Sequence, residues 1–249
     1  MGIAVILPTY NERENIEALI GELLSLHRLD HIIVVDDNSP DGTGEVVDRL
    51  AASDARVVAV HRPSKQGLGR AYIAGFQRAL ELGSSVVITM DADFSHHPRY
   101  IPAMLDLLAN GHDVVIGSRY VDGGGTANWG VERRFLSAGA NAFARLVLGL
   151  HAHDCTAGFR AYRRRVLETV PFQRILSEGY SFLVEMLFHC QRLGFRIGEV
   201  PILFEDRRQG RSKINQTEII RAIGTVFRLA QDRLVAKWRA SRRGNRRAY

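Results

Sequence analysis

The chain of 249 residues lacks the features that define several broad classes of protein. It has only two cysteines, Cys155 and Cys190, which are too few for a disulfide framework, so we expect a reducing compartment. No run of about 20 apolar residues occurs, so no helix is expected to span a bilayer. Internal repeats are absent, and the apolar start lacks the basic residues of a signal peptide, so none is expected. These absences favour an intracellular globular protein.

The composition that remains is ordinary for such a protein, except in its charge. Hydrophobic residues make up 46% and charged residues 24% of the chain, and the length allows one large domain or one domain with appendages. The net charge is +6 and the isoelectric point is about 9.7. An excess of basic residues indicates an anionic partner.

The first 120 residues alternate between apolar runs and helical patterns. Short apolar runs predict strands at Ile3–Leu7, Ile32–Val35, Val57–Val60, Val86–Met90 and Val114–Ile116. Helices are expected between them, the first with a capping box at Asn11 and Glu14, the others at Gly44–Ala52, Gly69–Leu82 and Pro98–Asn110, the last stopped by Gly111. This alternation predicts an α/β fold with a doubly wound, mostly parallel sheet flanked by helices.

Two carboxylates in the segment Asp91-Ala92-Asp93 directly follow the fourth predicted strand. Open α/β sheets bind ligands at the carboxyl ends of their strands, and hard oxygen ligands suit Mg²⁺ or Mn²⁺. Taken alone, such a pair is more often a solvated turn. It therefore needs support from the rest of the chain.

That support comes from the residues that follow the other predicted strands. They bring carboxylates, an aromatic ring and an arginine to the same edge of the sheet: Pro8 to Glu12, Asp36 to Thr43, and Gly117 to Arg119. Each has a plainer explanation, since Asn11, Ser39 or Asp41 can cap helices and Tyr10 can pack. Their joint placement nevertheless favours a nucleotide pocket.

The motifs Pro8-Thr9-Tyr10-Asn11-Glu12, Val35 to Ser39, Asp91-Ala92-Asp93 and Gly117-Ser118-Arg119 resemble those of inverting glycosyltransferases with the GT-A fold. Asp36 to Thr43, Gly67 to Tyr72, Asn128-Trp129, Asp154 to Arg160 and Gly210 to Lys213 narrow the resemblance to the polyprenol- and dolichol-phosphate mannose synthases. It extends in order from residue 3 to about residue 215. It implies a GT-A, Rossmann-like sheet and transfer of mannose from GDP-mannose to a polyprenyl monophosphate, with inversion.

The resemblance also implies roles for individual residues. Pro8, Tyr10, Glu12 and Asp37 match nucleotide-contacting positions. Asp91 and Asp93 match the metal-binding pair, and Asp91 and Ala92 are also expected to contact the donor. Ser95 stands where some relatives carry glutamine as an additional metal ligand. A hydroxyl is shorter and weaker, so its contact with the metal is expected to run through water. Arg119, Arg133, Arg207 and Lys213 match basic positions around the donor diphosphate and the acceptor phosphate. Asp93, Arg119, Arg207 and Lys213 are the residues expected to act in catalysis.

The chemistry is consistent with these roles. Cleavage of a nucleotide sugar accumulates charge on a diphosphate, which a metal and arginines stabilise, and an ionised phosphate acceptor needs positioning more than a general base. Three alternatives stay open: transfer of glucose or another sugar, a sugar nucleotidyltransferase, and a nucleotide-sugar sensor without turnover. The Leu7-to-Asn11 segment lacks the glycine-rich loop and arginine of nucleotidyltransferases, and the acidic pair with Lys213 argues against a sensor.

The second half of the chain is expected to handle the acceptor. We predict a catalytic domain over residues 1–214, with a nucleotide-sugar half at 1–120 and an acceptor half at 121–214 whose Arg207 to Lys213 segment forms a lid. Residues 215–249 are predicted to form a C-terminal amphipathic helix and tail, because residues 228–249 hold eight basic residues and one acid, together with Trp238. No nucleic-acid motif is present, so we expect peripheral attachment to the cytoplasmic face of a membrane, or a membrane partner protein, and no nucleic acid.

Other candidate residues receive plainer interpretations. His96 and His97 are expected to start a helix before Pro98 rather than bind the metal. His151, His153 and Cys155 are interpreted as loop residues, because nothing completes a four-ligand site. The apolar face of Arg133–Leu150 is expected to face the core rather than lipid, and Glu185 is given no role.

Overall fold

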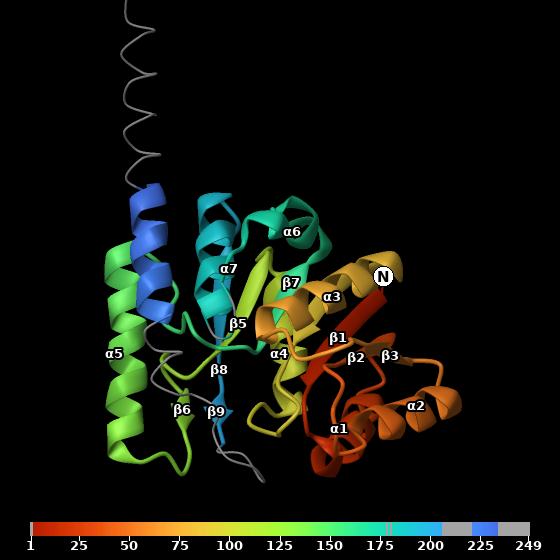
Figure 1. The fold of residues 1–249 in the computed structure, drawn as a ribbon. Helices are drawn as coiled ribbons and strands as arrows, with labels where there is room; N and C mark the ends of the chain where they lie inside the picture. The colour runs from red at the N-terminus through yellow and green to blue at the C-terminus, as the bar shows by residue number, and fades with distance from the viewer. Residues whose placement is uncertain (1, 178, 180, 206–220, 234–249) are drawn as a thin grey trace, which may run out of the picture.

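The fold is built on one seven-stranded sheet. A computed structural model describes residues 2–177, 179, 181–205 and 221–233. The strands lie in the order β3 (Val57–His61), β2 (His31–Asp36), β1 (Gly2–Thr9), β4 (Ser84–Thr89), β7 (Arg160–Arg163), β5 (Val114–Ser118) and β8 (Ile197–Pro201). All neighbours pair in parallel except β7, which runs antiparallel to both β4 and β5. The predicted mostly parallel sheet is confirmed, and all five predicted strands are present (Figure 1).

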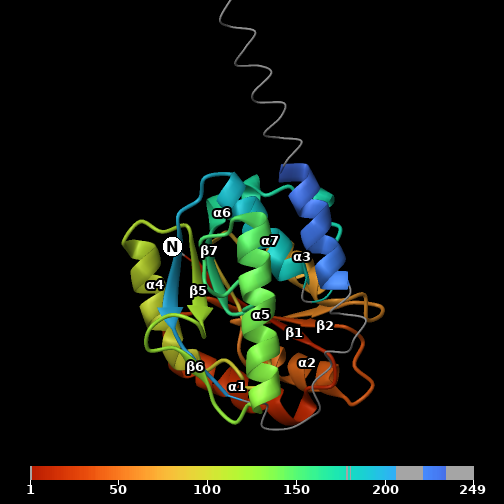
Figure 2. The ribbon, with the colours of Figure 1, turned by 90° about the vertical axis from the view of Figure 1, so that its left-hand side faces the viewer.

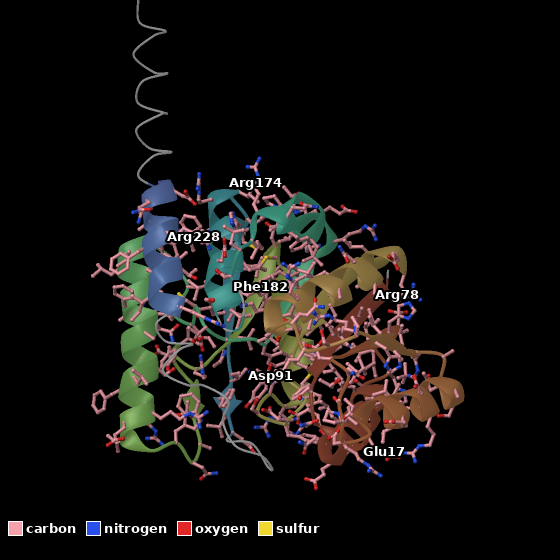
Figure 3. All side chains as sticks on the ribbon, in the orientation of Figure 1. Glu17, Arg78, Asp91, Arg174, Phe182 and Arg228 are labelled. Atoms are coloured by element: carbon pink, nitrogen blue, oxygen red, sulfur yellow. The ribbon has the colours of Figure 1, made fainter. Side chains whose placement is uncertain are left out.

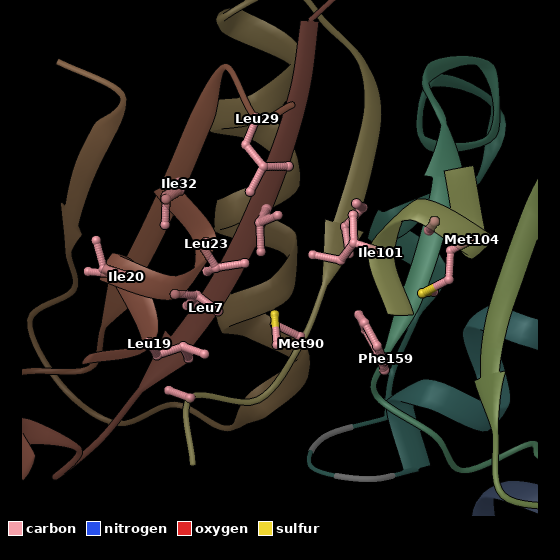
Figure 4. Close-up of a cluster of buried hydrophobic side chains, with 14 of the residues drawn as sticks. Leu7, Leu19, Ile20, Leu23, Leu29, Ile32, Met90, Ile101, Met104 and Phe159 are labelled. Carbon is pink, nitrogen blue, oxygen red and sulfur yellow. The ribbon is translucent and has the colours of Figure 1, made fainter. Parts of the chain in front are cut away.

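Helices cover both faces of this sheet. One hydrophobic cluster holds side chains of α1 (Arg13–Ser25), α2 (Thr43–Ser53) and α4 (Ile101–Ala109), among them Leu23 and Met104 (Figure 4). The cluster on the opposite face holds side chains of α3 (Leu68–Glu81), α6 (Arg164–Thr169) and α7 (Ser181–Arg192). Single 3₁₀ turns occur at Pro98–Tyr100 and Phe172–Arg174. Burying the sheet on both sides explains why its parallel strands are continuously apolar rather than alternating.

A third cluster joins α5 (Val131–Leu148) to α7 and to the helical residues 221–233, and Figure 2 shows these elements side by side. Glu185 of α7 is fully buried there and accepts a hydrogen bond of 2.7 Å from Arg228 and one from Ser177. Burial alone raises the pKa of Glu185, but its hydrogen bonds bring that pKa down to about 2. This buried carboxylate therefore fixes residues 221–233 against α7.

Two local expectations are wrong. The predicted capping box fails because α1 begins at Arg13 after Glu12, while Asn11 takes a left-handed φ of 60° and its amide bonds Ser39. The expected core-facing surface on Arg133–Leu150 is also largely wrong. Only Asn141, Ala144 and Leu148 of α5 are buried, whereas Phe135 is 75% and Leu146 84% exposed. Gly111 does follow α4 with a φ of 91°, as expected of a helix stop.

A small two-stranded sheet completes the described fold. Strands β6 (Gly125–Thr126) and β9 (Leu203–Phe204) pair in parallel beside the carboxyl end of β5. Among the described residues, no helix is both long and apolar enough to cross a membrane. The predicted amphipathic segment falls mostly outside the described residues, which include 221–233 of it.

Close packing of α3 on β1 leads to a first prediction. A Cβ on Gly75 would lie 2.5 Å from Cγ2 of Ile6, whereas a Cβ on the exposed Gly21 of α1 would meet nothing within 4 Å. Gly75→Ala should therefore lower the free energy of unfolding by about 1–3 kcal/mol through overpacking. Gly21→Ala, its matched control, should raise it by roughly 0.5–1 kcal/mol. Urea unfolding measures both, and equal shifts would contradict the packing described here.

Candidate active site

The parallel strands end in register, and this places their following residues at one edge. Thr9 of β1 lies opposite Asp36 of β2, which lies opposite His61 of β3. Asp91 follows β4 and Arg119 follows β5 at the same edge. Figure 3 shows Asp91 at the end of the sheet where β1 finishes, well away from Arg228. The predicted gathering of polar side chains at the carboxyl edge is therefore present.

The two carboxylates of the Asp91-Ala92-Asp93 segment differ in environment. The Asp91 side chain is 26% exposed, whereas Asp93 and Ala92 are buried. Oδ1 of Asp93 accepts hydrogen bonds from the Ser95 hydroxyl at 2.6 Å and from the Ser95 amide at 3.1 Å. Ser95 is thus buried as an orienting partner of Asp93, and its hydroxyl proton is committed to that carboxylate. Phe94 between them takes a left-handed φ of 63°, a strained conformation typical of functional sites.

His96 and Tyr72 hold Asp91 from two sides. The backbone amide of Asp91 donates to Nδ1 of the buried His96 at 3.3 Å, and the Tyr72 hydroxyl donates to Oδ1 of Asp91 at 3.4 Å. Burial is the main cause that lowers the pKa of His96 to about 4, so the ring is neutral at pH 7. Gly158 lies close to both groups, because a Cβ there would lie 3.2 Å from the Tyr72 hydroxyl and 3.4 Å from Oδ1 of Asp91. His97, by contrast, accepts from the Arg99 amide at the start of the 3₁₀ turn, as predicted.

Arg119 is held by a buried carboxylate that the sequence did not reveal as its partner. Its Nε and Nη2 donate to Oδ2 and Oδ1 of Asp154, both at 2.7 Å, and Nη2 also donates to Thr156. The Arg119 side chain is 8% exposed and that of Asp154 0%. Burial opposes the charge on both groups, yet the ion pair raises the pKa of Arg119 and lowers that of Asp154. Among the described residues no hydrogen bond uses Nη1 of Arg119.

The two aspartates at the end of β2, Asp36 and Asp37, have different partners. Asp36 accepts from the hydroxyls of Thr9 and Ser39 and from the Ser39 amide, which fixes the loop. Asp37 accepts a 2.6 Å hydrogen bond from Nη1 of Arg62, a residue that sequence reasoning missed. Burial raises the pKa of Asp37, and Arg62 opposes that rise.

The remaining residues expected to contact the nucleotide lie along the same edge. Pro8 is partly exposed between the buried Leu7 and Thr9 of β1, and the centroid of the Tyr10 ring lies 4.2 Å from the ammonium of Lys65. The Glu12 amide donates to the Thr43 hydroxyl, and its carboxylate accepts from Asn15. Asn11 and Asn38, in the loops after β1 and β2, both take left-handed φ angles near 60°. These strained loops place Tyr10, after β1, and Asp37, after β2, at the carboxyl edge of the sheet.

On the other side, aromatic rings and guanidinium groups meet in front of β5. The Arg133 guanidinium lies 4.1 Å and that of Arg119 5.6 Å from the ring centroid of Trp129. Phe204 of β9 makes T-shaped contacts with both Trp129 and His96. The ring centroids are 5.3 Å apart in the first contact and 5.2 Å apart in the second. Two of the four predicted phosphate-binding residues are therefore brought together. The other two, Arg207 and Lys213, and with them the predicted lid, lie outside the described residues.

Groups of three or more potential metal ligands are not found among the described residues. His153 pairs with Glu199 at 2.9 Å, and burial raises the pKa of the Cys155 thiol to about 12, as suits loop and core residues. Asp91 and Asp93, at the carboxyl edge of the sheet, are the carboxylates that the predicted metal pattern specifies. Hard cations held by one or two carboxylates complete their coordination with water and substrate phosphates.

Comparison with known proteins assigns the chain to a family. The sequence profile of glycosyl transferase family 2 matches residues 4–170. The chain belongs to glycosyl transferase family 2. This glycosyltransferase is 46% identical over 228 residues to the polyprenol monophosphomannose synthase of Mycolicibacterium smegmatis, with 91% of this chain and 85% of the relative covered. It is 43% identical over 242 residues to the undecaprenyl-phosphate mannosyltransferase of Micrococcus luteus, covering 97% and 98% of the two chains. The resemblance to polyprenol-phosphate mannose synthases is confirmed.

Solved structures confirm the expected GT-A fold of the glycosyltransferase. Glucosyl-3-phosphoglycerate synthase of Mycobacterium tuberculosis, in complex with Mn²⁺, UDP and glucosyl-3-phosphoglycerate, superposes with a TM-score of 0.68 at 21% identity, covering 92% of this chain and 80% of that one. Mannosyl-3-phosphoglycerate synthase of Rubrobacter xylanophilus gives 0.65 at 21% identity, covering 96% and 75%. At this identity the likeness concerns the fold alone.

The buried pair of Arg119 and Asp154 gives a second prediction. Asp154→Asn leaves a buried guanidinium without its counter-charge and should destabilise the glycosyltransferase by about 3–5 kcal/mol. The control Glu168→Gln removes the half-exposed pair with Arg164 and should change stability by less than about 0.5 kcal/mol. Chemical denaturation at pH 7 compares the two. A loss for Asp154→Asn no larger than the control's would show that the pair is not structural.

Proposed function

We propose that this glycosyltransferase moves mannose from GDP-mannose to a polyprenyl monophosphate, with inversion at the anomeric carbon and with a divalent cation. The names of the two relatives at 46% and 43% identity support the sugar and the acceptor. The observation that carries the proposal is the placement of Asp91 and Asp93, which follow β4, and of Arg119, which follows β5, at the same edge of the sheet. That arrangement suits the departure of a charged diphosphate.

The donor set fits Mg²⁺ or Mn²⁺. Asp91 is partly exposed and Asp93 is oriented by two bonds from Ser95, so these carboxylates would hold the cation. Such a cation neutralises the charge that develops on the diphosphate as the sugar leaves. Ser95 is better suited to orienting Asp93 than to direct ligation, since its hydroxyl already donates to that carboxylate.

The protein's own residues provide orientation and fixed charge. Asp154 holds the Arg119 guanidinium rigidly with its Nη1 edge free of described hydrogen bonds, which preorganises it for a phosphate oxygen. The nucleoside is bound by Asp37, Tyr10 and Glu12. Arg62 orients Asp37 through its hydrogen bond to that carboxylate. Because the acceptor phosphate is already ionised near neutral pH, it attacks without a general base, and positioning by Arg133, Arg207 and Lys213 suffices. Displacement from the face opposite the diphosphate inverts the anomeric centre.

The acceptor implies a membrane, which the glycosyltransferase would reach from the cytoplasmic side as a peripheral protein or through a membrane partner protein. The basic composition of residues 228–249 supports attraction to anionic lipids, worth about 1 kcal/mol per basic residue near the surface. Exposed apolar side chains on α5, Phe135 and Leu146 among them, are compatible with this location.

A third prediction tests the metal. Asp91→Asn and Asp93→Asn should each reduce transfer of radiolabelled mannose by roughly a thousandfold, about 4 kcal/mol, because leaving-group stabilisation is lost. The fold should survive, and EDTA should reproduce the loss in the wild type. Asp106→Asn, on the exposed side of α4, is the matched control and should retain full activity. Full turnover in metal-free buffer would refute the metal requirement.

A fourth prediction tests the donor. GDP-mannose with Mn²⁺ should raise the melting temperature more than UDP-glucose at equal concentration, since stabilisation grows with occupancy of the folded state. Asp37→Asn should shrink the shift given by GDP-mannose, whereas Asp48→Asn on the exposed α2 should not. Equal or reversed shifts would move the assignment to another nucleotide sugar, with glucose as the next candidate.

A further inference from the structure

Trp129 carries a polar group that the described structure leaves unsatisfied. Trp129 is only 8% exposed, and among the described residues its indole Nε1–H has no hydrogen-bond partner. An unsatisfied buried donor costs about 1–3 kcal/mol, and native proteins keep few of them. A donor retained at this cost, at the edge of an active site, is suited to an acceptor that arrives with the substrate.

The loop that carries Trp129 is held firmly. The amide of Ala127 donates to the Phe204 carbonyl at 2.8 Å, which extends the pairing of β6 with β9. Asn128 then takes a left-handed φ of 60°, which turns the chain just before the tryptophan. Phe204 packs against Trp129 in a T-shaped contact, with the ring centroids 5.3 Å apart. The indole is therefore positioned in advance, and its N–H needs no rearrangement to meet a ligand.

The surroundings of the ring select the kind of ligand. The Arg133 guanidinium lies 4.1 Å above the ring and that of Arg119 lies 5.6 Å away. Arg133 occupies a ring face, which disfavours stacking of a sugar there. Asp154 neutralises Arg119, while the Arg133 guanidinium places its positive charge against the ring that carries the N–H donor. Such a site favours a negatively charged oxygen over a neutral one.

We propose that Trp129 binds a phosphate oxygen of the substrates through its indole Nε1–H, beside Arg133 and Arg119. This inference rests on the proposed function for the identity of the phosphates, which are the donor diphosphate and the acceptor monophosphate. Phe204 contacts both Trp129 and His96, and His96 accepts from the Asp91 amide, so two side chains, Phe204 and His96, connect the indole to the acidic pair. Both phosphates meet in this region during transfer.

The test measures binding, so it does not depend on turnover. The full chain has two tryptophans, and Trp238→Phe leaves Trp129 as the single fluorophore. In that background, calorimetry and tryptophan emission are recorded with GDP plus Mn²⁺ and, separately, with a short water-soluble prenyl monophosphate. Trp129→Phe then removes the N–H and keeps an aromatic ring for Arg133. Replacement of Trp129 by 3-benzothienylalanine, which exchanges the N–H for sulfur at nearly constant size, controls for the smaller phenylalanine ring.

We expect one probe to shift the emission of Trp129. Both replacements of Trp129 should lower the affinity for that probe by about 10- to 100-fold, which is the contribution of a hydrogen bond to a charged group. The probe affected identifies the source of the phosphate, and the other serves as internal control. Unchanged affinity for both probes in the benzothienylalanine protein overturns the inference alone. The inference is also overturned if Trp129→Phe lowers the affinity for both probes equally while the benzothienylalanine protein keeps its affinity, because that result indicates a packing effect. Failure of the wild type to bind either probe overturns the proposed function, and this inference with it.

Discussion

The site depends on one geometric constraint, the common register in which the parallel strands end. Thr9, Asp36 and His61 lie opposite one another across three strands, so the loops that follow must leave the sheet at the same level. Burial of both sheet faces enforces this register, because a slip by one residue would turn apolar side chains such as Val34 away from their cluster. The polar loops therefore meet as a consequence of core packing, at the edge where open α/β sheets bind ligands.

At that edge, most charges are paired rather than merely assembled. Asp36 is satisfied by Thr9 and Ser39, Asp37 by Arg62, and Arg119 by Asp154. Each pair fixes the direction of a side chain before any ligand arrives, so little reorganisation is needed when diphosphate charge develops. Within the described residues, Asp91 is the more exposed member of the acidic pair, which suits the carboxylate that meets a cation first.

Much of this could be predicted from sequence, because the signals are local. Apolar runs located five strands, and acidic residues just after them located the pocket edge. The partners of those residues could not be predicted, since Asp154 lies 35 positions from Arg119 and Arg62 25 positions from Asp37. Strand β7 was missed because its Arg160 is polar, although it is fully buried and donates to three backbone carbonyls. The surface of α5 was misjudged because helical periodicity does not reveal whether a partner covers it.

Tyr72 connects the hydrophobic core directly to the chemistry. Its ring is fully buried and stacks on Phe76 and Phe182, with centroids 6.2 and 6.0 Å away, while its hydroxyl bonds Asp91. A change in how α3 packs on α7 is therefore transmitted to a carboxylate at the pocket edge. Attempts to make the enzyme more heat-resistant by repacking this region would shift Asp91 as well. For protein engineering, Phe76 and Phe182 belong with the active site, although neither carries a polar atom in its side chain.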